Sequence, residues 1–466
     1  MKQNSTTARI TGEWMWSDTI ANAGSDGAEK VLSRCAEMGI TDVYLLVKGT
    51  AGKLAYLRTK HTDLLLRDDR DILGEAICAA HTHGIRLHAW ICNLEDAAYK
   101  AAHPDAGMWH YVKARDNAHI NPYDPGYRAH MADIAAELAA YDIDGLHFDY
   151  IRYNHLANGW SQEDTDALTA MGADIGRIRA LMETTFGYRG QPADGCSIFN
   201  AYRNGDRDAR LIAKYRRTMV RDYAASVIAA ARSVRENLII SAATMPEGAY
   251  DEAFADLHYG QDYRDAATLY DYICPMAYSM SFGMDENWLC TVAKNAVQMG
   301  NRVVMGLQAF GGVSSSRLMR ETEVIRTYAQ KEPWAACMNG IVLFRAAQYD
   351  YAKITVGAAG DMTVKTVSSS GRHYRWVQID MLEGIRITDA HIGRGYCSDT
   401  TVWVSPDGTS VKFFGENDIT TGAEGHLHLC CEGDSLTAWR LPVVRVGGEQ
   451  EYLVYTQFSQ DSDSPL

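Results

Sequence analysis

The feature that most constrains the fold of this 466-residue chain is a series of eight short apolar runs in its first 350 residues, most of them followed by a helical pattern. Several runs lack the strict alternation of a half-exposed sheet, as expected for parallel strands covered on both faces. Eight strand and helix repeats are typical of a closed (β/α)8 TIM barrel. The runs span residues 12–18, 41–49, 85–93, 144–153, 238–246, 270–280, 302–311 and 340–349.

Two parts of the chain depart from this repeat. The stretch after the fourth run, residues 154–237, is far longer than one crossover helix needs, and it contains an Ala/Arg-rich helical pattern at 206–236. We therefore expect an insertion after strand 4. Beyond residue 353, short alternating runs separated by Gly and Asp turns replace the helical pattern. The sequence predicts a catalytic barrel domain at 1–353 and a C-terminal all-β, sandwich-like domain at 354–466.

Composition excludes several classes of partner. The net charge of -14 argues against nucleic acid and against anionic membranes, because both require a basic surface. No segment has the roughly 20 apolar residues of a membrane span, and the N-terminus lacks the apolar core of a signal peptide. We expect a cytoplasmic protein, with secretion after removal of a leader as the alternative. The sequence leaves the oligomeric state open.

The residues that close the strands are the candidate site, since barrel enzymes work at the C-terminal ends of their strands. They form a ring of aromatic and polar side chains, which suits a sugar because its apolar faces stack on aromatic rings and its hydroxyls bind polar groups. The substrate-binding candidates are Trp14, Trp16, Trp90, Asn93, His147, Arg152, Tyr278, Gln308 and Arg345. The aromatic residues Trp14 and Trp90 have an alternative role, which is to fill the barrel interior.

Asp149 is the leading candidate for the reacting group. It lies in DGLHFDYIRY, residues 144–153, where alternation places His147 and Asp149 on one face of the strand. A buried Asp needs partners or a chemical role. The alternative is a structural carboxylate that pairs with Arg152 or with a backbone amide.

Glycoside hydrolysis ordinarily uses two carboxyl groups, and Glu247 is the candidate for the second. Asp149 and Glu247 end adjacent strands, which lie about 4.8 Å apart, so their side chains could reach the spacing of about 5–5.5 Å found in a retaining pair. Asp149 would act as nucleophile and Glu247 as proton donor, without a cofactor. His147 and Tyr278 would orient Asp149. The alternatives to Glu247 as proton donor are Glu95, Asp96, Asp251 and Asp285.

A His-Thr-His sequence, His81 to His83, has the spacing of a metal site. It precedes Gly84 at the end of a helical pattern, away from the predicted active-site face. Histidines in the last turn of a helix complement the helix dipole. We therefore expect no metal.

The chain resembles the glycosyl-hydrolase-like family 10, a group distinct from the family 10 xylanases. The resemblance covers most of residues 10–350 and rests on HAWICN, CPMAY and GLQAFG, and above all on the block from NPYDPGYR to DGLHFDYIRY. It implies a TIM barrel that acts on an oligosaccharide or polysaccharide. A fainter similarity to family 18 chitinases aligns their acidic motif with Asp144, Gly145, His147 and Asp149. Ile151 stands where their catalytic Glu would be, so their mechanism does not transfer.

Two other functions are compatible with the residues. One is a catalytically silent barrel that binds glycans. The other is a sugar lyase or aldolase, which would need a Schiff-base Lys deep in the barrel. Strands 4 to 8 contain no such Lys, which leaves Lys48 on strand 2. We expect a glycosidase.

Overall fold

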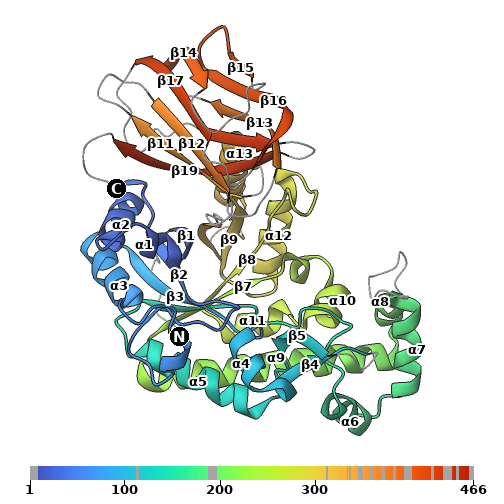
Figure 1. The fold of residues 1–466 in the computed structure, drawn as a ribbon. Coiled ribbons are helices and arrows are strands. Elements are labelled where there is room, and N and C mark those ends of the chain that lie inside the picture. Colours follow the sequence, from blue (N-terminus) through green and yellow to red (C-terminus); the bar gives the residue numbers. More distant parts are fainter. Residues whose placement is uncertain are drawn as a thin grey trace. The chain divides into compact units, whose positions relative to one another are not determined.

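Eight parallel strands close into a barrel in the computed structural model, in the order β1, β10, β9, β8, β7, β6, β3, β2 (Figure 1). Each predicted run overlaps one of them, so the (β/α)8 fold is confirmed. The strands are β1 Ile10–Trp16, β2 Asp42–Lys48, β3 Arg86–Cys92, β6 Gly145–Asp149, β7 Ile239–Thr244, β8 Tyr272–Pro275, β9 Val303–Gln308 and β10 Met338–Phe344. The structure describes residues 9–111, 115–186, 197–310, 313–332, 334, 337–344, 350–356, 362–368, 373–380, 385–392, 401–420, 425–433, 443–447 and 451–460.

The helices begin where the sequence provides caps. Asp71 accepts a hydrogen bond from Gly74 N at the start of α3, and Ser161 and Asp164 form a capping box at the start of α6. The α-helices are α1 Ser17–Asn22, α2 Gly27–Glu37, α3 Ile72–Thr82, α4 Ala97–Ala102, α5 Pro125–Ala139, α6 Gln162–Ala170, α7 Ile175–Phe186, α8 Ser197–Arg203, α9 Arg207–Val234, α10 Glu252–Phe254, α11 Tyr263–Leu269, α12 Glu286–Gln298 and α13 Ser315–Lys331. Shorter turns are η1 Thr62–Leu64, η2 Pro104–Ala106, η4 Pro246–Ala249 and a π-helical turn, η5 Ala255–Tyr259.

Alternation along each strand separates the barrel interior from the layer under the helices. On β6, Leu146 and Phe148 belong to the apolar core that packs against the helices. His147 points the other way and bonds across the interior to Trp14 and Ser241. Every residue of β6 is buried, because the strand is covered on both faces.

The barrel interior contains a buried network of hydrogen-bonded and stacked side chains from β2, β3 and β8, in addition to aliphatic side chains. The hydroxyls of Tyr44 and Tyr272 are 2.8 Å apart, and Tyr44 stacks on His88 with ring centroids 4.6 Å apart. Space for these rings comes from glycine: a Cβ on Gly145 would lie 2.2 Å from His88 Nδ1. The glycine is therefore required by close approach.

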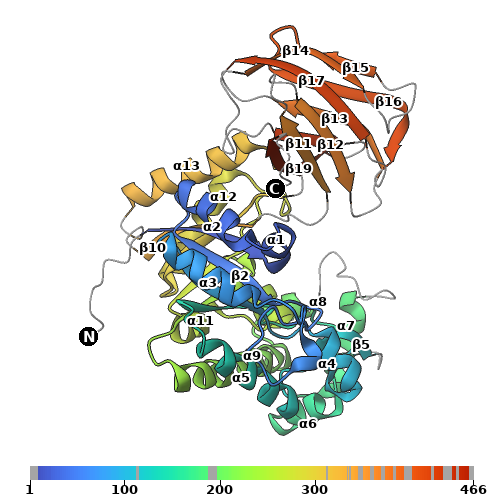
Figure 2. The ribbon, with the colours of Figure 1, turned by 60° about the vertical axis from the view of Figure 1, so that its left-hand side comes forward.

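The insertion predicted after strand 4 is present and consists of α6 to α9. The long helix α9 falls within the predicted 206–236. Figures 1 and 2 both place α6, α7 and α8 beside the hairpin of β4 Gly107–Trp109 and β5 Arg115–Ile120. Backbone bonds such as Trp160 N to Trp109 O, at 2.9 Å, join this hairpin to the segment after β6.

The chain divides into two compact units. One comprises residues 1–307 and 322–343, and the other comprises residues 308–321 and 344–466. The second unit holds the predicted C-terminal all-β region, whose nine strands have the hydrogen-bonded order β14, β17, β12, β11, β19, β18, β13, β16, β15. The predicted domain limits and sandwich-like packing stay predictions. These strands are β11 Asp350–Val356, β12 Met362–Ser368, β13 His373–Asp380, β14 Ile385–Ile392, β15 Thr401–Val404, β16 Ser410–Thr420, β17 Gly425–Gly433, β18 Val443–Gly447 and β19 Glu451–Gln460.

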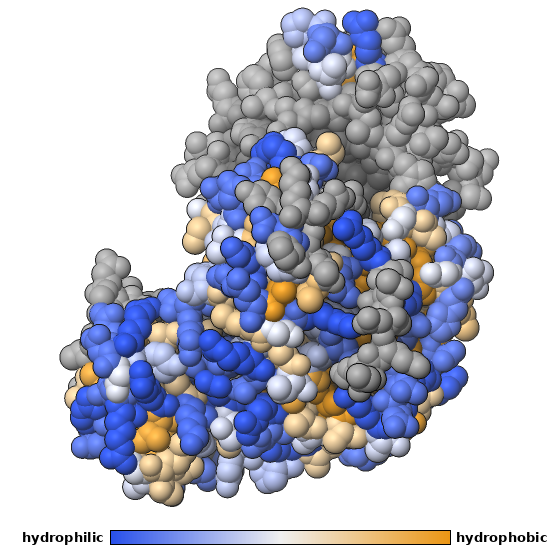
Figure 3. All heavy atoms as spheres, turned by 180° about the vertical axis from the view of Figure 1, so that it is seen from behind, coloured by the Kyte–Doolittle hydropathy of each residue, from blue (hydrophilic) through white to orange (hydrophobic). Residues whose placement is uncertain are grey.

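The described surface is polar. Seen from behind, hydrophilic side chains predominate and hydrophobic ones form small separate areas (Figure 3). None of the helices in the described part of the chain has the length and hydrophobicity to cross a membrane.

Candidate active site

Asp149 lies at the C-terminal end of β6, on the interior face of the barrel, as predicted from its alternation with His147. Its side chain is buried and accepts hydrogen bonds from Trp90 Nε1, at 3.2 Å, and from Tyr150 N, at 2.6 Å. The Arg152 guanidinium lies 3.6 Å from Asp149 Oδ1. Burial raises the pKa of Asp149, and the charge of Arg152 together with the two N–H donors offsets part of that rise.

The backbone at Asp149 is hydrogen-bonded to Asn93, which directly follows β3, and the next residue has a strained conformation. Asn93 is buried and donates both its backbone N–H, at 2.8 Å, and its side-chain Nδ2, at 3.0 Å, to the carbonyl of Asp149. The next residue, Tyr150, has a φ of 50°, the one positive value among the described non-glycine residues. Such a conformation costs about 1–3 kcal/mol and tends to occur at functional sites. It turns the chain sharply beyond Asp149.

Arg152 is a charged residue that acts on both predicted carboxyls. Its guanidinium lies over the ring of Tyr150, 4.7 Å from the centroid, and its Nη1 is buried without a hydrogen bond to any described residue. Its charge lowers the pKa of Asp149 and also that of Glu247. Both carboxyls therefore lie within electrostatic reach of one cation.

Glu247 lies in η4, immediately after β7, and is half-buried. Its Oε1 accepts a hydrogen bond from Tyr259 Oη at 3.3 Å, whereas its buried Oε2 has no hydrogen-bond partner in the described part of the chain. Burial raises the pKa of Glu247, and the charge of Asp251 adds to the rise. A carboxyl with few donors and a raised pKa suits a proton donor.

The alternative proton donors are engaged elsewhere. Asp251 and Asp285 cap α10 and α12 through hydrogen bonds from backbone N–H groups. Asp96 caps α4 and forms a buried ion pair with Lys48. Glu95 pairs with His119 at 3.2 Å. Among these candidates, Glu247 is the one with a buried carboxyl oxygen that has no hydrogen-bond partner in the described part of the chain.

His147 does not have the predicted role of orienting Asp149. Its Nε2 accepts a hydrogen bond from Trp14 Nε1 at 2.9 Å, and its Nδ1 is 2.8 Å from Ser241 Oγ. Burial lowers the pKa of His147, so the ring is neutral. The indole of Trp90 holds Asp149 instead. His147 and Trp14 are fully enclosed in the barrel interior, so neither has a surface for a sugar.

The remaining predicted substrate-binding residues differ in their position and in their hydrogen-bond partners. Tyr278 lies after β8, and the charge of Asp149 adds to the effect of burial in raising its pKa, which places it near Asp149. Trp16 ends β1 and is half-buried. Gln308 ends β9, is buried and donates to Phe310 O at 3.1 Å. Asn93 has a structural role, because its side-chain amide donates hydrogen bonds to the backbone carbonyls of Ile91 and Asp149. Arg345 lies outside the described residues.

Lys48 is not a free amine. It is fully buried, forms an ion pair with Asp96 Oδ2 at 2.8 Å and donates to Cys92 O at 2.9 Å. Burial would raise the pKa of Asp96, but the ion pair with Lys48 outweighs it and the pKa is lowered. A Schiff base requires a neutral lysine. The geometry therefore disfavours the lyase or aldolase alternative.

The histidines of the His-Thr-His sequence bind carboxylates on separate elements. His81 lies 3.0 Å from Asp144, and His83 lies 2.8 Å from Glu29. Among the described residues, one group of three carboxylates is spaced for a cation: Glu252, Asp256 and Asp262. The guanidinium of Arg217 contacts Asp256 at 3.2 Å and Asp262 at 3.1 Å, so an arginine already provides the positive charge there.

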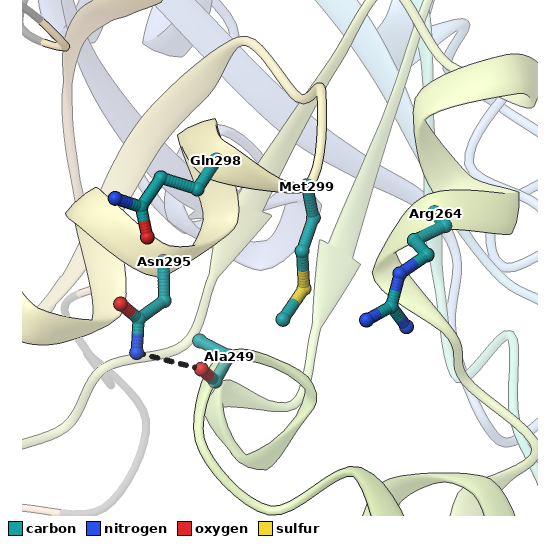
Figure 4. Close-up of a pocket in the computed structure, with 5 residues that line it drawn as sticks. All are labelled: Ala249, Arg264, Asn295, Gln298 and Met299. Carbon is teal, nitrogen blue, oxygen red and sulfur yellow. Dashed lines mark hydrogen bonds between the residues drawn. The ribbon is translucent and has the colours of Figure 1, made fainter.

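Two cavities among the described residues lie away from Asp149. The larger, of about 380 Å³, is lined by Ala249, Arg264, Asn295, Gln298 and Met299 (Figure 4). In Figure 4 the Asn295 amide points at the Ala249 carbonyl, to which it donates at 2.9 Å. The second is lined by residues of α9 and α11 and of the loop between η5 and α11, together with Ile151 and Thr244. Neither cavity is the one predicted at Asp149.

Sequence reasoning missed two tyrosines of the site. Tyr150 and Tyr259 flank Arg152 and Glu247, respectively. Tyr150 follows Asp149 directly, so its proximity was available from the sequence. Tyr259 comes from the π-helical turn η5, for which the sequence carries no clear signal.

Comparisons with known proteins agree with the barrel. A family model described as "Putative glycosyl hydrolase domain" matches residues 18–355. A comparison with curated proteins gave no match. Among solved structures, a beta-galactosidase from the psychrophilic Marinomonas ef1 is similar at 10% identity, with a TM-score of 0.50 over 72% of this chain and 53% of that chain. At that identity the likeness shows the fold alone.

Two further solved structures have lower TM-scores. The catalytic domain of beta-amylase from Paenibacillus polymyxa is 13% identical, with a TM-score of 0.49, and the match covers 72% of this chain and 92% of that chain. The glycoside hydrolase domain of PelA from Pseudomonas aeruginosa is 12% identical, with a TM-score of 0.37. The match covers 73% of this chain and 96% of that chain.

Proposed function

Because the chain belongs to the family described as "Putative glycosyl hydrolase domain" over residues 18–355, we propose that it is a glycoside hydrolase whose carboxyl pair is Asp149 and Glu247. The observation that carries the proposal is the contrast between the buried Asp149 and the half-buried Glu247, whose pKa values are both lowered by one arginine. Asp149 has two N–H donors and the nearby Arg152 cation, which favour its ionised form. Glu247 has one long hydrogen bond and an oxygen without a partner, which favour its protonated form.

The proposed reaction uses the two carboxyls in sequence. Asp149 forms a bond to the anomeric carbon while the glycosidic C–O bond breaks, and Glu247 gives its proton to the departing oxygen. In the second step Glu247 takes a proton from water, and the resulting hydroxide displaces Asp149 from the anomeric carbon. If the carboxyls are too far apart for direct attack, Asp149 activates the water and the reaction inverts. Neither route requires a cofactor.

Arg152 supports both steps. Its charge lowers the pKa of Asp149 against the effect of burial, and its buried Nη1 makes no hydrogen bond to any described residue. Trp90 orients Asp149, whereas Trp16, Tyr278 and Gln308 stay predicted contacts of the substrate. Membership of glycosyl-hydrolase-like family 10 and cytoplasmic location also stay predictions.

The test is a hydrolysis screen with aryl glycosides and with oligosaccharides of glucose, galactose and N-acetylglucosamine. We expect the wild-type chain to hydrolyse at least one substrate and Asp149→Asn to lose at least about a thousandfold in kcat, because the nucleophile acts as part of a unit. Asp166→Asn, on the exposed face of α6, is the matched control. Glycan binding without hydrolysis by the wild type would instead support the silent barrel.

A further inference from the structure

Three aromatic rings gather beside Glu247. Trp288 in the first turn of α12 packs against Tyr250, with ring centroids 5.9 Å apart, and against Phe282, with centroids 5.4 Å apart. Tyr250 directly follows η4, the turn that carries Glu247, and its backbone N donates to Glu247 O at 3.0 Å. Phe282 lies in the loop between β8 and α12. We refer to Tyr250, Phe282 and Trp288 as the aromatic cluster.

Within the aromatic cluster, Tyr250 is close enough to Glu247 for the two side chains to interact electrostatically. The ionised carboxylate of Glu247 adds to burial in raising the pKa of the Tyr250 phenol. Both loops that supply the rings follow the C-terminal ends of barrel strands, where the chemistry of this fold takes place. The rings therefore border the proposed proton donor rather than the helical layer alone.

The aromatic cluster has the chemical character of a sugar platform. Tyr250 is 40% exposed. Trp288 Nε1 is a buried donor without a hydrogen-bond partner in the described part of the chain. An apolar ring surface edged by the exposed phenol of Tyr250 matches a sugar, which has apolar C–H faces and a rim of hydroxyls.

The platform is held in place before any ligand arrives. Asp285 caps α12 by accepting hydrogen bonds from the backbone N of Asn287 and of Trp288, at 3.0 and 3.1 Å. Asn295, two turns further along α12, donates to Ala249 O in η4 (Figure 4). These contacts join the helix of Trp288 to the turn of Glu247 and Tyr250. A preorganised platform loses little entropy on binding.

The order of the strands determines on which side of Glu247 the aromatic cluster lies. Asp149 ends β6, Glu247 follows β7, and the aromatic cluster comes from the loops after β7 and β8. The cluster thus lies on the β8 side of Glu247, and Asp149 lies on the β6 side. A general acid protonates the glycosidic oxygen, so the atoms beyond that oxygen belong to the leaving group.

From this placement we propose that the aromatic cluster is the subsite for the leaving part of the substrate, and that this leaving part is itself a sugar ring. The inference rests on the proposed role of Glu247 and narrows the substrate to glycosides with a sugar on both sides of the cleaved bond. Such an enzyme prefers oligosaccharides to glycosides with small leaving groups.

The experiment compares kcat/KM for two kinds of substrate with the same glycone: oligosaccharides of glucose, galactose or N-acetylglucosamine, and the corresponding glycosyl fluorides. Fluoride is too small to reach the platform. We expect Tyr250→Ala and Trp288→Ala to lower the oligosaccharide-to-fluoride ratio about tenfold, the loss of one stacking contact of about 1.4 kcal/mol. Tyr123→Ala removes a comparably exposed tyrosine next to α5 and should leave the ratio unchanged.

Each outcome separates this inference from the proposed function. An unchanged ratio in both variants, or an equal loss on both substrates, would overturn the subsite. If the wild type hydrolyses neither kind of substrate, the proposed function itself fails. Should Trp288→Ala not fold, Tyr250→Ala decides alone, because Tyr250 is at the surface and its truncation leaves the core intact.

Discussion

Arg152 and Asp149 form the central ion pair of the site: the guanidinium lies 3.6 Å from Asp149 Oδ1, and its charge reaches Glu247 as well. The geometry of this pair supports the proposed chemical role of Asp149 over a structural one. A purely structural Asp would be neutralised by a fully bonded partner, whereas here Arg152 Nη1 is buried and makes no hydrogen bond to any described residue. The cation is placed to adjust both carboxyls.

The pH profile tests that relationship. Arg152→Gln removes a charge that lowers the pKa of Asp149 and of Glu247, so both pKa values should rise. Asp149 must be ionised and Glu247 protonated, so the acid and alkaline limbs of kcat/KM should both move to higher pH. Arg232→Gln, which removes a partly buried ion pair with Asp271 on the outside of the proposed site, is the control. A shift of one limb only would show that Arg152 does not act on both groups.

The proton donor is tested by the leaving group. Glu247→Gln should reduce kcat on oligosaccharides by about 10²- to 10⁴-fold, the usual contribution of general acid catalysis, and much less on aryl glycosides with acidic phenols, which leave without a proton. The separation of the carboxyls, about 5–5.5 Å or about 6.5–9.5 Å, sets retention or inversion, which proton NMR of the first product reports. Equal losses on both substrate types would contradict the acid role.

Orientation of Asp149 is expected to depend on Trp90, not His147. Trp90→Phe removes the 3.2 Å hydrogen bond to Asp149 and keeps the ring, so kcat should fall about tenfold and the acid limb should move to higher pH. His147→Gln should affect stability instead, because His147 bonds only within the barrel interior. Urea unfolding measured beside kcat separates the two effects. A larger catalytic loss in His147→Gln at equal stability would restore the role predicted from sequence.

Gly145 tests the interior packing. In Gly145→Ala the new Cβ would lie 2.2 Å from His88 Nδ1 and 3.0 Å from Ile239 O, so the free energy of unfolding should fall by at least about 1–3 kcal/mol. Gly49→Ala is the matched control, since its Cβ would lie 3.6 Å from Leu46, an ordinary contact. Chemical denaturation gives both values. A Gly145→Ala chain as stable as the wild type would mean that His88 is free to move.

Lys48 distinguishes the glycosidase from the lyase or aldolase. Borohydride treatment with a sugar phosphate should leave the mass of the chain unchanged, because the Lys48 amine is buried and paired with Asp96. Lys48→Met should lower the free energy of unfolding by about 3–5 kcal/mol, since it leaves a buried Asp96 without its cation. Lys48→Met combined with Asp96→Leu should recover most of that loss. A trapped adduct on Lys48 would reverse the assignment.

The sequence alone determined the local and periodic features of this protein. Eight apolar runs specified eight barrel strands, because covered parallel strands and amphipathic helices each have their own spacing. Alternation put Asp149 on the interior face, since side chains change sides at every residue of a strand. Caps such as Asp71 and Ser161 also acted within a few residues of themselves.

Only the tertiary structure decided which side chains meet. His147 shares a face with Asp149, yet its partners come from β1 and β7, and the indole that bonds Asp149 comes from β3. Likewise, only packing left Glu247 Oε2 without a partner in the described part of the chain and engaged Asp96, Asp251 and Asp285 as helix caps. Partners from distant strands depend on barrel closure and register, which no local pattern encodes. Burial and charge at a site are sums over those partners, so they exist only once the chain has folded.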